Sequence, residues 1–92
     1  MFTNKAGNGR NNICGYQIAK YRKALGKSQR QLAEALQLLG LDVDKNAVQR
    51  IEAGKRFVTD IELVHLAKAL GLSYEQLLDQ KEQNVRERYG QK

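Results

Sequence analysis

The sequence predicts an all-α fold, a single domain built from five short helices. Three features of the chain lead to this prediction. Its 92 residues have the length of one small domain. Apolar residues recur at spacings of three and four through the middle of the chain, which is the periodicity of amphipathic helices. Proline is absent, and four glycines fall where helices are expected to stop: Gly26, Gly40, Gly54 and Gly71.

The first helix is expected at residues 14–25. Four apolar side chains along it are four, three and four residues apart, and this spacing places them on one face: Cys14, Ile18, Tyr21 and Leu25. Three bases of the same segment lie mostly on other faces: Lys20, Arg22 and Lys23. The helix is therefore expected to bury one side and to leave a basic side in solvent.

The second helix is expected to start after Ser28 and to end at Gly40. The Ser28 hydroxyl is a favourable N-cap, and Gln31, three residues later, completes a capping box. The buried stripe of this helix is expected to consist of Leu32, Ala33, Leu36 and Leu39.

A third, shorter helix is expected between Asp44 as the N-cap and Gly54 as the stop. Val48 and Ile51 are its inward pair. Most of its other positions are polar, so this helix is expected to expose most of its surface.

The fourth and fifth helices each follow a hydroxyl N-cap. Thr59 and Glu62 form a second capping box, and Ser73 caps the fifth helix, with Leu72 packing at its entry. The side chains expected inside are Ile61, Leu63, Leu66, Ala67 and Leu70 in the fourth helix, which ends at Gly71, and Tyr74, Leu77 and Leu78 in the fifth.

Residues 13–78 are thus expected to form the folded domain, with a flank on each side. Residues 1–12 contain four Asn and two Gly and are expected to form a flexible arm. In residues 79–92 the only sizeable apolar side chains are Val85 and Tyr89. Their spacing suits a helix extension or a small docking helix, and a polar tail that frays in solution is an equal alternative.

The composition excludes several classes of protein. Hydrophobic residues make up 41% of the chain, too many for a disordered protein. No apolar run approaches the ~18 residues of a membrane-spanning helix, and the N-terminus lacks a signal-peptide core, so a cytoplasmic location with no membrane partner is expected. Cys14 and His65 are the only residues of their kinds, which excludes an intramolecular disulfide and a Cys/His zinc site. No metal, no cofactor and no catalytic residues are expected, and the chain is not expected to be an enzyme.

The formal net charge is +6, and its distribution along the chain is uneven. Five bases and no acid stand between residues 20 and 30: Lys20, Arg22, Lys23, Lys27 and Arg30. Four bases stand with the single acid Glu52 between residues 45 and 56: Lys45, Arg50, Lys55 and Arg56. In residues 57–79 the sign of the charge reverses, because the segment contains four acids and a single base, Lys68. Solubility alone does not require this segregation of charge. Binding of a phosphate backbone to the basic side would gain free energy from it, through the release of counterions.

The second and third helices match the plan of a helix-turn-helix, in which the second helix of the pair enters the DNA major groove. Opposite Val48 and Ile51, the third helix presents long polar side chains that are assigned to base reading: Lys45, Asn46, Gln49 and Arg50. Arg and Lys can donate to guanine O6 and N7, and Asn or Gln can pair with adenine. A solvated polar face without a binding function would contain Glu as readily as Gln or Arg. These four residues are amides and cations, so they favour a DNA-binding function.

Over about residues 15–78 the sequence resembles the Cro and phage-repressor type (XRE-like) of helix-turn-helix transcriptional regulators. Four motifs support the resemblance: Ile18-x-x-Tyr21-Arg22, Ser28-Gln29-x-x-Leu32-Ala33, Val48-x-x-Ile51-Glu52-x-Gly54-x-Arg56, and Leu66-Ala67-x-Ala69-Leu70-Gly71-Leu72-Ser73 followed by Leu77-Leu78. The resemblance implies a five-helix, lambda-repressor-like domain that binds double-stranded DNA in a sequence-specific way. It implies a transcriptional regulator that acts as a homodimer on a palindromic operator, and a repressor is the favoured kind of regulator.

The resemblance also implies roles for single residues. Gln29 would donate to a DNA phosphate at the start of the second helix, where free backbone amides assist it. Other phosphate contacts are assigned to Lys27, Ser28, Arg30, Lys55 and Arg56. Arg22 would form an ion pair with Glu52, which positions the third helix and withdraws Arg22 from DNA.

The chain departs from the family pattern between Ser28 and Asp44. The second helix is longer by about three residues, nearly one turn at ~1.5 Å per residue, and the turn after Gly40 is longer by about two. The apolar side chains of this extension are expected to pack it: Leu38, Leu41 and Val43.

A second function stays open beside DNA binding. The reversal of charge after Arg56 and the pair Val85 and Tyr89 also suit a protein-binding adaptor, such as an antitoxin or an anti-regulator. A regulatory protein is therefore a further candidate partner. Leu78, Val85 and Tyr89 are the candidate apolar contacts of a homodimer.

Overall fold

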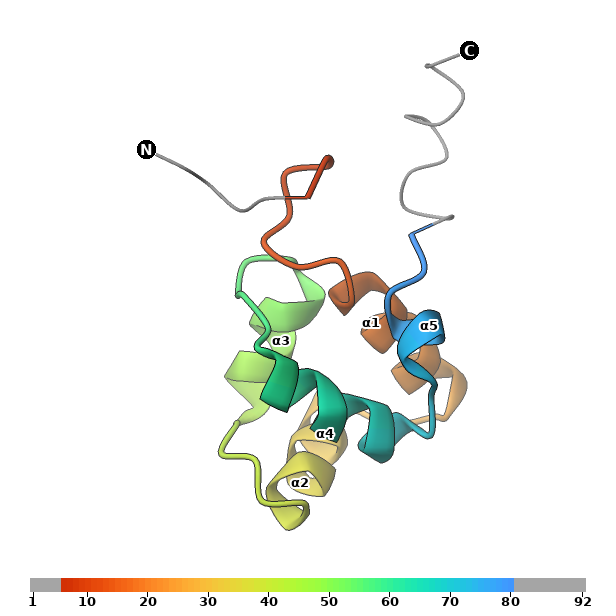
Figure 1. Ribbon diagram of the computed structural model, residues 1–92. Coiled ribbons are helices and arrows are strands. Elements are labelled where there is room, and N and C mark those ends of the chain that lie inside the picture. The colour runs from red at the N-terminus through yellow and green to blue at the C-terminus, as the bar shows by residue number, and fades with distance from the viewer. Residues whose placement is uncertain (1–5, 81–92) are drawn as a thin grey trace.

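The structure is a computed structural model that describes residues 6–80, and within them it contains five helices and no strand (Figure 1). The helices are α1 (Gly15–Ala24), α2 (Gln29–Leu38), α3 (Lys45–Glu52), α4 (Asp60–Leu70) and α5 (Tyr74–Leu77). The all-α prediction and the order of the five helices are confirmed. The candidate apolar residues Val85 and Tyr89 lie outside the described residues.

The helix starts follow from side-chain caps. The side chains of Ser28, Thr59 and Ser73 each accept a hydrogen bond from the backbone N–H three residues later. The side-chain oxygen at that later position in turn accepts from the backbone N–H of the cap residue, so each pair forms a capping box. Asp44 caps α3 by accepting from the Ala47 N–H. Cys14, the N-cap residue of α1, makes no side-chain cap bond, and the Asn12 side chain accepts from the Gly15 N–H instead. The four glycines that were expected to stop helices all have positive φ.

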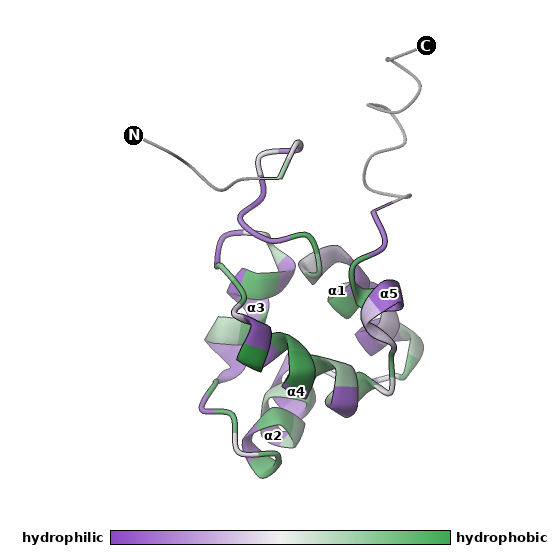
Figure 2. Ribbon diagram, viewed as in Figure 1, coloured by the Kyte–Doolittle hydropathy of each residue, from purple (hydrophilic) through white to green (hydrophobic). Residues whose placement is uncertain are grey.

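All five helices contribute to one hydrophobic core. In it, α2 packs against α3 and α4, and α1 packs against α3, α4 and α5. The buried apolar residues are Cys14, Ile18, Leu32, Ala33, Leu36, Val43, Val48, Ile51, Leu66, Ala67, Leu70 and Leu77. Figure 2 shows α4 as largely hydrophobic, whereas α3 alternates between hydrophobic and hydrophilic turns. Because α3 buries only Val48 and Ile51, its remaining surface is free to face a ligand.

Several apolar residues at helix ends are exposed, where the sequence analysis expects them inside. Leu25 and Leu39 occupy the C-cap positions of α1 and α2, and they are 52% and 42% exposed. Ile61 and Tyr74, in the first turns of α4 and α5, are more than half exposed. The prediction of their burial is wrong because periodicity identifies a face of a helix, while burial also requires a neighbouring element opposite that turn.

The longer α2 and turn are packed by fewer side chains than expected. Val43 is buried and Leu41 packs against the core, but Leu38 is 89% exposed. Two hydrogen bonds complete the turn: the side-chain Gln37 Nε2 donates to the Val43 carbonyl at 2.7 Å, and the Leu41 N–H donates to the Leu36 carbonyl. The extension is therefore an ordered part of the domain.

Residues 10–12, at the end of the segment that the sequence predicts to be a flexible arm, are held by hydrogen bonds, whereas residues 1–5 of that segment lie outside the described residues. Residues 10–12 pass beside the C-terminal end of α3 (Figure 1) and hydrogen-bond to its carbonyl groups. Asn12 is 9% exposed. An Asn-rich composition predicts disorder only where the amide side chains find no partners, and here residues far along the chain supply them.

None of the helices in residues 6–80 is both long enough and apolar enough to span a membrane.

The core of α2 offers a matched pair of substitutions. Leu36 is fully buried and Leu38, two residues later, is exposed. We expect Leu36→Ala to lower the free energy of unfolding by about 2–5 kcal/mol, because it removes buried methyl groups and leaves a cavity. Leu38→Ala should change it by less than about 0.5 kcal/mol. Urea denaturation followed by circular dichroism measures both, and equal losses would contradict the assigned packing of α2.

Candidate nucleic-acid interface

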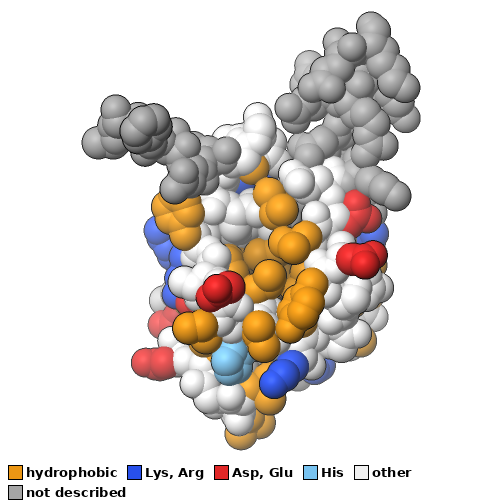
Figure 3. Space-filling model, viewed as in Figure 1, with side chains coloured by type: hydrophobic (Ala, Val, Ile, Leu, Met, Phe, Trp, Pro, Cys, Tyr) orange, Lys and Arg blue, Asp and Glu red, His pale blue; other side chains and the backbone are white. Residues whose placement is uncertain are grey.

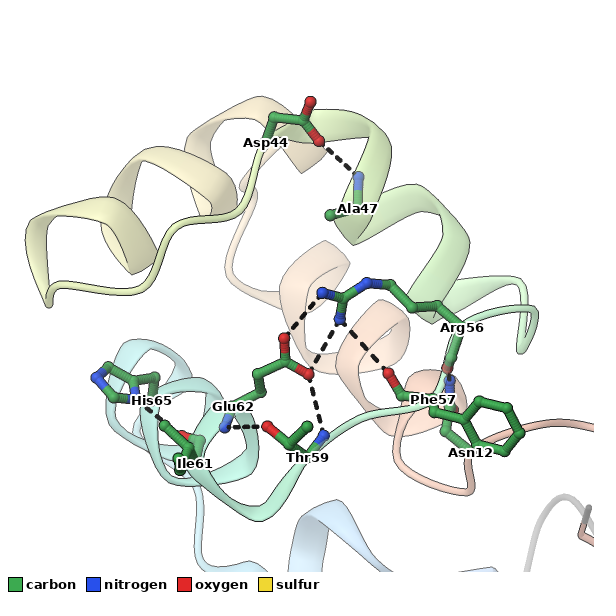
Figure 4. Close-up of polar contacts among 9 residues, drawn as sticks. All are labelled: Asn12, Asp44, Ala47, Arg56, Phe57, Thr59, Ile61, Glu62 and His65. Carbon is green, nitrogen blue, oxygen red and sulfur yellow. Dashed lines mark hydrogen bonds and ion pairs between the residues drawn. The ribbon is translucent and has the colours of Figure 1, made fainter. Parts of the chain in front are cut away.

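The outer face of α3 presents the four side chains assigned to base reading. Asp44 Oδ1 accepts from the Ala47 N–H at 2.8 Å and fixes the start of the helix (Figure 4). Val48 and Ile51 then turn into the core, so the opposite positions face outward. All four outward residues are exposed: Lys45, Asn46, Gln49 and Arg50. Their side chains form no hydrogen bond or ion pair with any other residue between 6 and 80.

A shallow hollow lies at the C-terminal half of this face. It has a volume of about 300 Å³ and is lined by Asn46, Gln49, Arg50, Ala53 and Lys55. The lining offers amide and cationic donors, and none of it is acidic. Such a surface suits an electron-rich partner, because Arg, Lys, Asn and Gln all donate hydrogen bonds.

The N-terminus of α2 is a second group of donors. The capping box uses the Ser28 hydroxyl and the Gln31 N–H, and helix geometry leaves the amides of the first residues without intrahelical partners. Lys27, Ser28 and Arg30 lie around this end, with Ser28 and Arg30 exposed. Free amides and bases together make an N-terminus suited to an anion.

The predicted ion pair between Arg22 and Glu52 is present and links α1 to α3. Arg22 Nε donates to Glu52 Oε2 at 2.6 Å, and Arg22 Nη2 donates to Oε1 at 3.0 Å. Arg22 Nη1 also donates to the Lys27 carbonyl. The hydrogen bond to Glu52 raises the pKa of Arg22, and Arg22 is only 8% exposed. Its charge is therefore directed into the fold.

Gln29 takes part in the same network. Its Nε2 donates to Glu52 Oε1 at 3.0 Å, so in this structure the amide points into the domain and away from the phosphate contact that the sequence analysis assigns to it. The reason is that Glu52 Oε1 accepts from both Arg22 and Gln29. The network neutralises Glu52, the only acid of α3, and it links the start of α2 to the end of α3.

Arg56, which the resemblance assigns to a phosphate contact, forms an ion pair within the domain, and its phosphate contact stays a prediction. Its guanidinium donates to both carboxylate oxygens of Glu62, at 3.0 and 2.8 Å (Figure 4). The arginine side chain is 31% exposed and the glutamate side chain 12%. Glu62, expected to act in a capping box alone, both pairs with Arg56 and caps α4, since its Oε1 also accepts from the Thr59 N–H. Lys55 therefore remains as the exposed base of this loop.

The pKa of Glu62 is lowered by its partners. Burial alone favours the neutral acid, but the hydrogen bond from Arg56 and those from Thr59 outweigh it. The carboxylate is thus stabilised in its charged form.

Two residues that the sequence analysis did not assign complete the end of α3. Asn12 Nδ2 donates to the carbonyls of Ile51 and Arg56, at 3.0 and 2.7 Å, and Arg10 Nη2 donates to the carbonyl of Glu52 at 2.6 Å. No local pattern predicts them, because their partners lie about forty positions away in the sequence. Both act on the helix and not on its outer face.

The face that carries α4 has a different character. Figure 3 shows hydrophobic side chains gathered there between acidic ones. A groove of about 310 Å³ lies on the domain, and its apolar lining consists of Ile13, Cys14, Val58, Leu63 and Leu78. Phe57 beside it is 56% exposed. The molecule therefore separates a polar, basic α3 face from a more apolar and acidic face.

The lone cysteine and histidine hold ordinary structural positions. Burial raises the pKa of the Cys14 thiol to about 11, so the thiol stays protonated near neutral pH. His65 Nδ1 lies 2.8 Å from the Ile61 carbonyl on its own helix. Within the described part of the chain, no group of three or more His, Cys, Asp or Glu side chains is arranged to hold a metal ion.

Known proteins are similar to this chain in sequence and in fold. The model of a helix-turn-helix family matches residues 18–77. Among solved structures, the restriction-modification controller protein C.AhdI from Aeromonas hydrophila is 30% identical, with a TM-score of 0.61 over 70% of this chain and 86% of that chain. The clp gene regulator ClgR from C. glutamicum is 26% identical, with a TM-score of 0.64 over 74% of this chain and 82% of that chain.

A third solved structure has the same fold. The hypothetical transcription factor NHTF from Neisseria is 22% identical, with a TM-score of 0.68 over 86% of this chain and 85% of that chain. Among curated proteins, none matches the chain.

The Arg22–Glu52 pair predicts a large effect of removing one partner. We expect Glu52→Ala to lower the free energy of unfolding by about 3–5 kcal/mol, because it leaves the buried Arg22 guanidinium without its counter-charge. Glu34→Ala, which removes an exposed acid from α2, should change it by less than about 0.5 kcal/mol. Chemical denaturation of both variants measures the difference, and similar losses would contradict the structural role of the pair.

The lowered pKa of Glu62 predicts a pH-dependent stability. Because the folded chain binds this proton less readily than the unfolded chain, the contribution is complete above the ordinary value of 4.5 and is lost as the pH falls below it. Glu62→Gln can keep the capping box through its remaining oxygen, and it removes the charge together with one of the two oxygens that accept from Arg56. We expect the wild type to have the higher Tm at pH 7 and the gap to shrink below pH 4.5. A gap that stayed constant down to pH 3 would argue against this assignment.

Proposed function

The chain belongs to the Cro and phage-repressor type of helix-turn-helix proteins, a family of DNA-binding transcriptional regulators and not of enzymes, and from this premise we propose what it binds and how. We propose a sequence-specific regulator, a repressor, that places α3 in the major groove of its operator. Residues 13–78 act as the DNA-binding domain. The observation that supports this proposal best is the outer face of α3, where four exposed donor side chains stand together without internal partners.

The base-reading chemistry follows from the residue types on this face. Arg50 and Lys45 can donate to guanine O6 and N7, and Asn46 and Gln49 can pair with the N6 and N7 groups of adenine. Lys45 and Asn46 stand in the first turn of α3, and Gln49 and Arg50 one turn later. Side chains from two successive turns of a recognition helix can reach neighbouring base pairs, so the four residues read one short half-site.

The phosphate contacts flank this helix on two sides. Lys27, Ser28 and Arg30 lie at the N-terminus of α2, where free amides add to their charge, and Lys55 follows α3. Gln29 serves this end through its backbone N–H, because its side chain bonds to Glu52. Arg56 contributes through its ion pair with Glu62, which holds the loop that carries Lys55.

The charge distribution supports the same orientation. The exposed bases around the start of α2 and on α3 neutralise phosphates and release condensed counterions, whereas the acids Asp60, Glu75 and Asp79 belong to segments that would face away from DNA. Binding is therefore expected to weaken steeply as the salt concentration rises.

We further propose that the regulator acts as a homodimer. The apolar groove that includes Leu63 and Leu78 supports a contact between copies, because an exposed apolar surface gains free energy when a partner covers it. A two-fold dimer binds an inverted repeat whose half-sites lie about 34 Å apart.

A protein-binding adaptor, such as an antitoxin or anti-regulator, is the second candidate function. It is favoured by the same apolar and acidic face, where Phe57 and Ile61 are more than half exposed. The two functions make opposite predictions for retention on DNA. A stoichiometric protein partner together with no DNA retention at moderate salt would favour the adaptor.

Selection of bound sequences from a random duplex pool tests the main proposal directly. The expected result is an enriched inverted repeat with two half-sites one helical turn apart. A pool without any enriched sequence would contradict sequence-specific binding.

A single substitution then tests the reading helix. We expect Arg50→Ala to weaken binding to the selected duplex by about 1–3 kcal/mol and to relax the preference at one base pair per half-site. Lys68→Ala removes the same charge from α4 and should leave both unchanged. Fluorescence anisotropy titrations at matched salt measure the affinities. If Arg50→Ala and Gln49→Ala both kept the wild-type affinity, α3 would not be the reading helix.

A further inference from the structure

We infer that residues 10–12, here named the N-terminal strap, position α3 for sequence reading. Arg10, Asn11 and Asn12 are then determinants of specificity that touch the recognition helix and not the bases. This inference rests on the proposed function and adds to it a second group of residues that decides which sequence is read.

Asn12 is the centre of the strap. Its Oδ1 accepts from the Gly15 N–H at 2.8 Å, and its Nδ2 donates to the carbonyls of Ile51 and Arg56. The amide therefore uses both donors and its acceptor at a position that is 9% exposed. It joins the start of α1 to the end of α3 and to the loop that follows.

The two neighbours of Asn12 bond to the carbonyls between these points. Arg10 Nη2 donates to the Glu52 carbonyl at 2.6 Å, the Asn11 N–H donates to the Gly54 carbonyl at 2.8 Å, and Asn11 Nδ2 donates to the Lys55 carbonyl at 3.0 Å. Five of the six carbonyls from residue 51 to residue 56 thus accept from the strap. Two of these five carbonyls, those of Ile51 and Glu52, belong to α3. The Ile51 carbonyl also accepts from the Gly54 N–H, whereas the Glu52 carbonyl, which has no intrahelical partner, accepts from Arg10 of the strap.

The sequence leaves room for this contact at two glycines. A Cβ at Gly15 would approach the Ile51 carbonyl oxygen far inside van der Waals contact, and a Cβ at Gly54 would come within 2.7 Å of the Arg10 guanidinium. Gly54 also has a φ of +77°, which a side chain would strain. The positive Arg10 side chain then lies at the negative end of the α3 dipole, where a cation is favourable.

The two ends of α3 are consequently held by different parts of the chain. Asp44 and the packing of α2 hold its N-terminal end, near Lys45 and Asn46. The strap holds the backbone of its C-terminal end, near Gln49 and Arg50, in addition to the bonds from α1 and α2 to the Glu52 side chain. Over eight residues at ~1.5 Å rise, a tilt of about 10° about the first end would shift the other by about 2 Å. Such a shift is enough to break a hydrogen bond to a base edge.

The experiment uses the full chain with Asn12→Ala and compares two duplexes of equal length, the selected operator and a scrambled sequence. We expect the ratio of operator to scrambled affinity to fall about tenfold, roughly the effect of one mismatched base pair. The base preference should broaden at the positions read by Gln49 and Arg50 more than at those read by Lys45 and Asn46. Scrambled-duplex affinity and the salt dependence should stay unchanged, because no phosphate contact is lost.

Two further variants separate positioning from a general loss of stability. Ser73→Ala removes the N-cap of α5 and so destabilises the domain without touching α3, and it should keep the wild-type affinity ratio. Asn11→Ala removes one exposed bond to Lys55 and should lower the ratio by a smaller factor than Asn12→Ala. If Asn12→Ala fails to fold, Asn11→Ala decides the question.

The outcomes distinguish this inference from the function on which it rests. A wild-type chain without sequence preference would overturn the proposed function and the strap's role together. A second outcome would overturn only the role of the strap. In it, the wild type prefers the operator, and the folded variants Asn12→Ala and Asn11→Ala both keep the same affinity ratio. An equal drop in Ser73→Ala would do the same, because it would reduce the effect to stability.

Discussion

The bond network around Glu52 is the constraint on which the DNA-facing side of the molecule depends. Glu52 is the only acid of α3, and a free carboxylate there would repel phosphate. Arg22 neutralises it from α1 and Gln29 bonds to it from α2, so the three helices meet at one carboxylate. The same contact that orients the recognition helix therefore also removes the unfavourable charge from it. The basic character of the face follows from which charges the fold pairs, as much as from how many it contains.

Local signals in the sequence predicted the order and limits of the helices well. The caps Ser28, Asp44, Thr59 and Ser73 act within four residues, and their effect can be read without the rest of the fold. Burial at the helix ends could not be predicted in this way. Leu25 and Leu38 continue the apolar character of their helices but find no element opposite them. Whether a side chain is covered depends on packing between segments, which a periodic pattern does not contain.

The same distinction applies to the candidate interface. The outward residues of α3 were predicted from residue type and helix geometry, both of which are local. Arg56 shows the limit, because the resemblance assigned it to a phosphate and gave no sign of the ion pair with Glu62, which lies 2.8 Å away in the fold. Asn12 shows the opposite case, since it lay in a segment expected to be flexible and proved to be nearly buried. Both differences arise from contacts that only the tertiary structure creates.

The long sequence separation of the strap contacts has a consequence for folding order. Asn12 bonds to carbonyls that follow it by 39 and 44 positions, so these bonds close a loop that contains α1, α2 and most of α3. A chain emerging from the ribosome can form the first two helices early, but it completes the end of the third only after residue 56 has appeared. Closing a loop of this length costs conformational entropy. The end of the reading helix is thus held by residues that precede it by about forty positions.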